Sequence, residues 1–411
     1  MVQVEGYKFI DGGVCAAKGF IAGGINAHVK KTSKKNDLAI VYAETMCSAA
    51  ALYTQNKVKG APITVTKKHL ANGKAQAIVV NSGNANTCNA NGIEIAEGMC
   101  DLTAKALGLS TDDIIVASTG VIGQQMTMEP FSENIPALAK NLSADGWNAA
   151  CEAIMTTDTR KKMFAVEFEL DGKTCHIGGM SKGSGMINPN MATMLGFVTT
   201  DVSITSEMLD KALRTVNAVT YNMVSVDGDT STNDTLAIMA SGLAGNAEIS
   251  AEGADFDKFV KGLYAVMMNL ARETARDGEG ATKLMECIVT NAPTQKDAQI
   301  VAKSVISSSL LKAAIFAADA NWGRILCAIG YADADFDISK VSVDLASEVG
   351  KIAVCRNGAG VDFSEDEAFK ILSEDEIQIL VDLHESGNGE ATAWGCDLTY
   401  DYVKINAEYR S

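Results

Sequence analysis

Helical and strand-like hydrophobic patterns alternate along this chain, and that alternation limits which folds it can adopt. Residues 256–278 place apolar side chains on one helical face, and helices are also expected at about 93–109 and 206–224. Residues 162–170 alternate apolar and polar side chains, as a half-buried strand does. Helices mixed with antiparallel-looking strands predict an α/β (α+β) fold built of layers, rather than a doubly wound parallel sheet.

Two turn signals predict β-hairpins. Asp171 and Gly172 follow the strand pattern directly, as the central residues of a tight turn do. Residues 377–405 alternate on both sides of Asn388-Gly389, which predicts a second hairpin at that dipeptide.

Two more predicted strands end in loops that can expose backbone groups. A short buried strand at 77–80 runs into a loop rich in Asn and Gly. Another apolar strand ends at Ser118, Thr119 and Gly120. Glycine directly after a strand allows a turn that presents backbone N–H groups, although the same pattern also describes a plain strand end.

Length and composition narrow the class of protein. A chain of 411 residues is expected to form two or three structural units. A formal charge of −16 argues against nucleic-acid binding, and it implies that any acidic substrate needs local positive charge in its pocket. We find no apolar run of about 18 residues and no secretion-signal pattern, so we expect no membrane partner and a cytoplasmic location.

Cysteine and histidine usage points to no metal chemistry. The ten cysteines are scattered, with no CxxC pair and no histidine at zinc spacing, so free thiols in a reducing cytoplasm are expected. Only four histidines are present, which is poor material for a metal site or a Ser-His-Asp triad. We therefore expect no metal.

The stretch "KGSGMINPNMATMLGFVTTD" (182–201) raises a different possibility. Thr193 stands alone in an apolar run, and it is either an ordinary strand residue or a nucleophile. A threonine hydroxyl needs a base, and the α-amine of an N-terminal threonine can serve because its pKa is about 7.7–8.0. That solution requires a cut between Ala192 and Thr193, which neither spacing nor periodicity reveals.

This stretch resembles the self-cleavage region of the ornithine acetyltransferase (glutamate N-acetyltransferase) family of arginine biosynthesis. Other segments resemble blocks of the same family, in the same order, almost to the C-terminus. They are "VNSGNANTCNA" (80–90), "STGVIG" (118–123), "IMTTDT" (154–159), "SVDGDTSTND" (225–234), "RDGEGATK" (276–283), "DANWGRI" (319–325) and "CDLTYDYVKINAEY" (396–409). The resemblance implies a layered sandwich of two lobes, with mixed sheets packed between helices.

The resemblance also implies a self-processing enzyme with an N-terminal threonine. Thr193 would be the nucleophile, freed by autoproteolysis after Ala192 to give an α chain, 1–192, and a β chain, 193–411. Thr119 and Gly120 resemble the family's oxyanion hole, whose donors stabilise developing negative charge by roughly 3 kcal/mol each.

Substrate-binding residues follow from the same matched blocks. Lys182 resembles a lysine that binds substrate, and it supplies the positive charge that an α-carboxylate needs. Glu279, Asn406 and Ser411 resemble further substrate contacts, although the family more often ends in threonine. One of Thr156 and Thr157 should also contact substrate, and the sequence does not choose between them. Asn188 departs from the small apolar residue expected before the proline, which bears on the rate of processing.

The implied activity is acetyl transfer from N2-acetylornithine to glutamate, giving ornithine and N-acetylglutamate without a cofactor. The resemblance further implies a heterotetramer of two α and two β chains. A bifunctional version would also use acetyl-CoA as a co-substrate, and the sequence does not separate the two. A hydrolase like the related self-processing aminopeptidases, in which water replaces glutamate, is a third candidate. A non-enzymatic binding protein on the same scaffold is a fourth.

Overall fold

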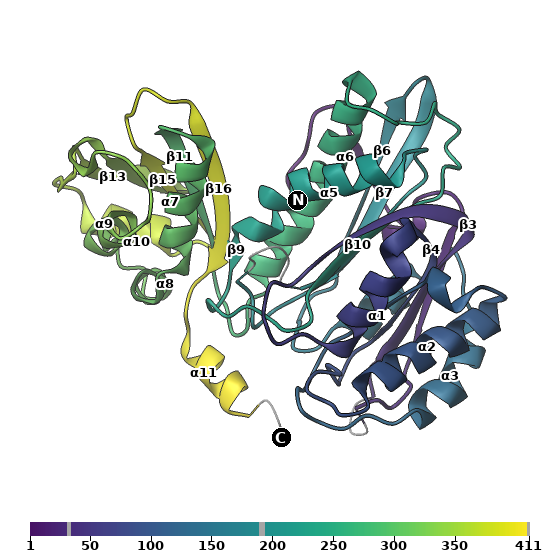
Figure 1. Cartoon of the computed structure of the whole chain (residues 1–411). Coiled ribbons are helices and arrows are strands. Elements are labelled where there is room, and N and C mark those ends of the chain that lie inside the picture. The colour runs from purple at the N-terminus through teal and green to yellow at the C-terminus, as the bar shows by residue number, and fades with distance from the viewer. Residues whose placement is uncertain (31–33, 189–193, 409–411) are drawn as a thin grey trace. The chain divides into compact units, whose positions relative to one another are not determined.

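The computed structural model describes residues 1–30, 34–188 and 194–408, and it divides into two compact units (Figure 1). The first unit comprises Met1–Gly183, Asn190–Ala218 and Thr230–Leu270. The second comprises Ser184–Pro189, Val219–Asp229 and Ala271–Ser411. Each unit contains one mixed sheet with helices, which confirms the predicted α/β class.

Nine strands of the described chain form the sheet of the first unit, in the order β1-β6-β7-β8-β10-β3-β4-β5 with β2 beside β3. Their bounds are β1 (Lys8–Ile10), β2 (Phe20–Ile25), β3 (Leu38–Tyr53), β4 (Lys74–Asn81), β5 (Ile114–Ser118), β6 (Lys162–Leu170), β7 (Lys173–Lys182), β8 (Leu195–Thr200) and β10 (Thr235–Ala240). The pairs β8–β10 and β4–β5 are parallel, and the other pairs are antiparallel. A mixed sheet was therefore the correct prediction.

Helices lie on both faces of this sheet. The described helices are α1 (Ala61–His69), α2 (Gly92–Leu107), α3 (Glu129–Ala139), α4 (Trp147–Ile154), α5 (Ser206–Ala218) and α6 (Ala254–Arg276). Alternate residues of β4 enter opposite cores: Ile78 and Val80 join a core with α4, whereas Ala77 and Val79 join a core with α2 and α3. The sheet is thus packed between helices, as predicted.

The second unit has its own sheet of seven described strands, in the order β14-β13-β12-β15-β11-β16-β9. These are β9 (Val224–Ser225), β11 (Leu284–Ala292), β12 (Ser342–Ser347), β13 (Gly350–Arg356), β14 (Ala359–Gly360), β15 (Glu376–Asp382) and β16 (Gly389–Cys396). Its helices are α7 (Gln295–Ser307), α8 (Ser309–Phe316), α9 (Trp322–Gly330), α10 (Glu365–Leu372) and α11 (Tyr400–Ala407). Short 3-10 turns occur in the chain at Gly13–Cys15, Leu70–Asn72, Thr111–Asp113, Tyr221–Met223 and Ile338–Lys340.

The hairpin predicted at Asn388-Gly389 is wrong. β15 and β16 form where the alternation indicated, but β11 lies between them and pairs with both. Gly389 serves a close backbone approach instead of a turn, because a Cβ there would lie 2.2 Å from the carbonyl oxygen of Thr294. By contrast, the hairpin at Asp171-Gly172 is confirmed, with φ values of 49° and 66° and Leu170 paired to Lys173.

The predicted helix at 206–224 is too long. α5 ends at Ala218, and the chain then enters the second unit at Val219. There β9 pairs with β16, so a short parallel strand replaces the last predicted turn of helix. Tertiary pairing has overridden a helical pattern at this boundary.

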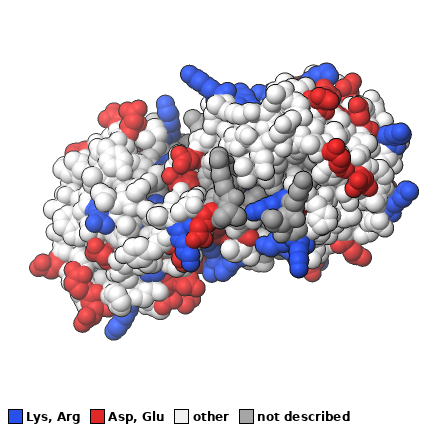
Figure 2. Space-filling view, turned by 90° about the horizontal axis from the view of Figure 1, so that it is seen from below, with Lys and Arg blue, Asp and Glu red and all other residues white. Residues whose placement is uncertain are grey.

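The surface charges and the state of the cysteines agree with what the composition predicted. Acidic side chains are scattered among uncharged residues on the face shown in Figure 2, so the negative charge there is spread over the surface. All ten cysteines are free thiols. No single helix of the described chain is long and apolar enough to span a membrane, and one bent pair, α7 with α8, passes on length and composition alone.

Candidate active site

The turn after β5 has a conformation that requires glycine. The Thr119 N–H donates to the carbonyl oxygen of Asn81 at 3.0 Å, and Gly120 then adopts a φ of 131°. A Cβ at Gly120 would lie 2.3 Å from the carbonyl carbon of Gly83 and 2.5 Å from the nitrogen of Asn84. Any larger residue would collide with backbone, so the predicted oxyanion turn is built around a glycine.

This turn offers two hydrogen-bond donors. The Thr119 hydroxyl and the Gly120 N–H have no hydrogen-bond partner within residues 1–30, 34–188 and 194–408. Both residues are partly exposed. Donors that are held rigidly and left unpaired suit the stabilisation of an oxyanion.

Asn233 joins the turn to the start of β10. Its buried amide nitrogen donates to the carbonyl oxygens of Ser118 at 2.9 Å and Ala85 at 2.5 Å. Its amide oxygen accepts from the hydroxyls of Thr87 at 2.5 Å and Thr232 at 2.7 Å. One side chain with four hydrogen bonds therefore fixes the turn relative to the strand beside β8.

β8 begins between the end of β7 and the start of β10. Leu195, its first residue, lies opposite Lys182 at the end of β7 and opposite Thr235 at the start of β10. The Thr235 N–H also donates to the carbonyl oxygen of Met194 at 3.0 Å. The chain directly after the predicted cleavage point is thus anchored on both sides.

Three predicted site residues lie outside the described residues. They are Ala192 and Thr193, at the predicted cleavage site, and Ser411 at the C-terminus. Their roles stay predictions.

Lys182 is a buried cation with nearby carboxylates. Its side chain belongs to a residue only 8% exposed, and its ammonium group makes no hydrogen bond or ion pair with any other described residue. Burial raises the pKa of Asp158, but the charges of Lys162, at 2.8 Å, and of Lys182 outweigh burial and bring that pKa below its usual range. Burial raises the pKa of Asp234 well above its usual value, against the opposing charge of Lys182. Asp158 is thus paired with Lys162 rather than with Lys182.

The loop carrying Thr156 and Thr157 is tied to this cluster through Asp158. The Thr156 N–H donates to Asp158 Oδ2 at 3.0 Å, and the Gly183 N–H donates to Asp158 Oδ1 at 2.7 Å. Both threonines are half-buried. The structure brings the loop to the residue after Lys182, but it does not choose between the two threonines.

The second unit brings together two other predicted residues. Asn406 Nδ2, on α11, donates to Glu279 Oε2 at 2.8 Å. The Glu279 N–H donates to the carbonyl oxygen of Ser184 at 2.9 Å, and Gly185 leaves room for its carboxylate, since a Cβ there would lie 2.3 Å from Oε2. Glu279 and Asn406 therefore form a direct pair next to the segment that follows Lys182 in sequence.

Sequence reasoning missed the residues that hold the site in place. Asp158 lies in the "IMTTDT" segment, and Asp227, Asn233 and Asp234 lie in "SVDGDTSTND". The sequence signal that could have found the last three is an Asp- and Asn-rich loop directly before a buried strand. Such a loop is costly to bury unless each of its polar groups finds a hydrogen-bond partner.

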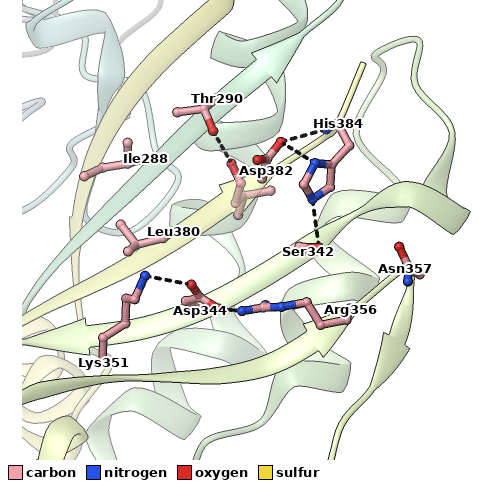
Figure 3. Close-up of a pocket in the computed structure, with 11 residues that line it drawn as sticks. Ile288, Thr290, Ser342, Asp344, Lys351, Arg356, Asn357, Leu380, Asp382 and His384 are labelled. Atoms are coloured by element: carbon pink, nitrogen blue, oxygen red, sulfur yellow. Dashed lines mark hydrogen bonds and ion pairs between the residues drawn. The ribbon is translucent and has the colours of Figure 1, made fainter. Parts of the chain in front are cut away.

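A pocket of about 540 Å³ lies elsewhere, on the sheet of the second unit (Figure 3). None of the predicted site residues lines it. His384 lies between Asp382 and Ser342, with Nε2 at 3.0 Å from the Ser342 hydroxyl, and thus resembles a triad by residue type. Asp382 Oδ1 also accepts the backbone N–H of His384 at 2.8 Å. This local side-chain-to-backbone hydrogen bond accounts for the position of Asp382 beside His384 without a catalytic role. No group of acidic, His and Cys side chains in the described chain is suited to hold a metal ion.

Comparisons with known proteins identify the family. The ArgJ family model matches residues 21–411. The arginine biosynthesis bifunctional protein ArgJ of Caldanaerobacter subterraneus subsp. tengcongensis is 49% identical over 405 residues, which is 98% of this chain and 100% of that protein. This chain belongs to the ArgJ family. It is therefore an acyltransferase of arginine biosynthesis, as the motifs predicted.

Two solved structures are also similar to this ArgJ family member. The bifunctional protein ArgJ of Bacillus halodurans is 48% identical, with a TM-score of 0.50, over 52% of this chain and 99% of that one. The ornithine acetyltransferase of Mycobacterium tuberculosis, solved with ornithine, is 30% identical, with a TM-score of 0.42, over 45% of this chain and 100% of that one.

Replacing the glycine of the turn tests whether its shape matters for catalysis. Gly120→Ala should lower the acyl-transfer rate by roughly 10²–10³-fold, because the collision displaces a donor of the predicted oxyanion hole. Gly123→Ala is the control: its φ is 74°, yet nothing lies within 4 Å of the added Cβ. Steady-state rates for the two variants separate collision from backbone strain, and an unchanged rate for Gly120→Ala would exclude the turn from the site.

The buried Asp234 predicts a pH dependence of stability. Its raised pKa means that folding takes up a proton, so this carboxyl group costs stability as pH rises above the unfolded pKa of about 3.9 toward the higher folded value. Asp234→Asn should therefore gain melting temperature relative to wild type as pH increases through that window. Thermal unfolding at a series of pH values measures the difference, with the exposed Asp362→Asn as control. A difference that did not change with pH would contradict the raised pKa.

Proposed function

We propose that the enzyme transfers acetyl from N2-acetylornithine to glutamate through an ester on Thr193. The Thr193 hydroxyl attacks the acetyl carbonyl carbon, and the threonine's own α-amine takes the hydroxyl proton. The C–N bond then breaks, ornithine leaves with a proton on its amine, and an acetyl-threonine ester remains. The amine of glutamate attacks that ester, giving N-acetylglutamate and free Thr193. One amide replaces another, so the cycle needs no energy input and no cofactor.

The Thr119–Gly120 turn is the observation that carries this proposal. Its two donors, which pair with no described residue, are connected through Asn233 to Thr235, whose N–H donates to the carbonyl oxygen of Met194, the residue after Thr193. This connection supports a role for the turn as the oxyanion hole of the attack by Thr193. Because the donors are already fixed, no rearrangement is needed as the negative charge develops.

The same proposal assigns roles to the other predicted residues. Lys182 would bind the α-carboxylate of either substrate, supported by its burial and by an ammonium group that pairs with no described residue. Glu279, oriented by Asn406, would receive the ammonium group of ornithine. Ser411 and one of Thr156 and Thr157 would complete the substrate contacts.

Processing between Ala192 and Thr193 is part of the proposal. The solved ArgJ chain of Bacillus halodurans matches 52% of this chain but 99% of its own length, as expected for one of two pieces. We also propose that two 1–192 and two 193–411 chains assemble as a heterotetramer in the cytoplasm. The ten free thiols support that location.

Intact mass under denaturing conditions tests the processing. The wild-type protein should give two chains of 192 and 219 residues (411 − 192 = 219), and Thr193→Ala should give one chain of 43.2 kDa without transferase activity. With N2-acetylornithine alone, the acetyl group should accumulate on the 193–411 chain. Thr215→Ala, on the exposed surface of α5, should be cut like wild type. A fully active Thr193→Ala protein would refute the mechanism.

A bifunctional enzyme is the second candidate, favoured over the monofunctional one by its relative's name at 49% identity. It would also acetylate glutamate from acetyl-CoA. Incubation with acetyl-CoA and glutamate, without N2-acetylornithine, should then release free CoA thiol and N-acetylglutamate, and Thr193→Ala is the matched blank. No CoA release above that blank would leave the monofunctional transferase.

A further inference from the structure

Hydrogen bonds hold five of the six residues that follow β7, namely Gly183, Ser184, Met186, Ile187 and Asn188. The Gly183 N–H donates to Asp158, and the Ser184 hydroxyl donates to the carbonyl oxygen of Asp277 at 2.6 Å. Residues 184–188 belong to the second unit, as do residues 219–229. This segment, which we name the arm (residues 184–188), ends just before the residues that contain the predicted cleavage site.

Asp227 receives two backbone N–H groups of the arm, and its neighbours Val226 and Gly228 make further contacts. Its Oδ2 accepts the Met186 N–H at 2.6 Å, and its Oδ1 accepts the Ile187 N–H at 2.9 Å. The Val226 N–H donates to the carbonyl oxygen of Ile187 at 2.7 Å. Asn188 Nδ2 donates to the carbonyl oxygen of Gly228 at 2.9 Å. One carboxylate thus receives two consecutive backbone N–H groups, as in charge-assisted anchors.

The contacts hold the arm in a conformation that it would not adopt unaided. Met186 has a φ of 54°, in the left-handed region that is unfavourable for a residue with a side chain. Such a conformation persists only where its surroundings fix it. The two bonds from Asp227 flank this residue, so they are the direct cause of the arm's path.

Asp227 is also bonded to the C-terminal helix of the same unit. The Tyr402 hydroxyl, on α11, donates to Asp227 Oδ2 at 3.3 Å. Burial and then the charge of Asp227 raise the pKa of Tyr402, so this phenol stays protonated and remains a donor. α11 carries Asn406, the partner of Glu279.

We infer that Asp227 is a positioning residue for self-cleavage, holding the arm so that the bond between Ala192 and Thr193 is presented to the Thr193 hydroxyl. This inference rests on the proposed function. On the C-terminal side of that bond, Met194 is anchored separately within the first unit, where its carbonyl oxygen accepts the Thr235 N–H at 3.0 Å. An attack that requires near-contact of the reacting atoms is sensitive to shifts of about 1 Å in such tethers.

Asp227→Asn tests the inference because the side chain keeps its size. The Met186 and Ile187 N–H groups donate to different oxygens of Asp227, so in the amide one of them would face an NH2 donor instead of an acceptor. We expect first-order processing, followed by denaturing gel and intact mass, to slow by at least about tenfold, equivalent to about 1.4 kcal/mol of activation free energy. Asp229→Asn is the matched control, since it removes the same charge from the same loop without a bond to the arm. The Asp229→Asn protein should be cut at a rate within about twofold of wild type if the hydrogen bonds of Asp227, and not the negative charge of the loop, control the cleavage rate.

A second measurement distinguishes positioning from general loss of structure. In the Thr193→Ala background, where every protein stays uncut, hydrogen exchange at the amides of Met186 and Ile187 should quicken in Asp227→Asn and not in Asp229→Asn. Melting temperatures of the three uncut proteins report on the fold as a whole. If Asp227→Asn does not fold, Asp227→Glu replaces it, because it keeps the charge but moves the carboxylate by one methylene group, and the same slowing is expected.

Each outcome decides the inference. The inference is supported if the wild-type protein is cut, Asp227→Asn is cut more slowly, and hydrogen exchange in Asp227→Asn quickens only at the arm. Processing of Asp227→Asn at the wild-type rate, or unchanged exchange at Met186 and Ile187, overturns the role of Asp227 and leaves the proposed function intact. A wild-type protein that is never cut overturns the proposed function, and this inference falls with it.

Discussion

The pairing of β8 with β7 and of β10 with β3 is the constraint on which the rest of the site depends. Each of these antiparallel pairs joins six residues of one strand to six of the other, and every residue of β8 and β10 is buried. β7 and β3 precede the predicted cleavage point, whereas β8 and β10 follow it. Backbone hydrogen bonds of about 1 kcal/mol each, together with the buried apolar surface, would therefore hold the two pieces in one sheet after a cut. A chain can expose a new N-terminus there without losing the strands that position it.

Lys182 is a buried lysine at the predicted site of an acidic protein. Lys162 forms an ion pair with Asp158, and burial raises the pKa of Asp234 well above its usual value against the opposing charge of Lys182. Among the described residues, the buried Lys182 ammonium group makes no hydrogen bond or ion pair, and burying an unpaired charge costs stability. On the proposed function, a substrate carboxylate bound by Lys182 would recover that cost, although the protein carries a net charge of −16.

Local sequence patterns predicted individual strands and turns better than they predicted which strands pair with each other. The turn at Asp171-Gly172 was correct because its two central residues need positive φ, a property that the residues themselves encode. The hairpin at Asn388-Gly389 failed because β11, about a hundred residues earlier, inserts between the strands, and no local signal reports that. At the site, motif resemblance named Lys182 and Glu279 but not Asn233 or Asp227. Those two act through backbone groups brought close by the fold, so their partners could not be read from spacing.

The histidines offer the nucleophile no obvious base, which favours the threonine's own amine. His176 bonds Asp201 at 2.6 Å, and His69 contacts the carbonyl oxygen of Ile114 at 2.9 Å. Across the described residues, no histidine forms a hydrogen bond with the Thr119–Gly120 turn, Lys182 or Met194. An α-amine has a pKa near the working pH and, once the chain is cut, sits on the same residue as the hydroxyl it serves. On the proposed mechanism, the cut would itself create the base, so acetyl transfer would begin only after self-cleavage.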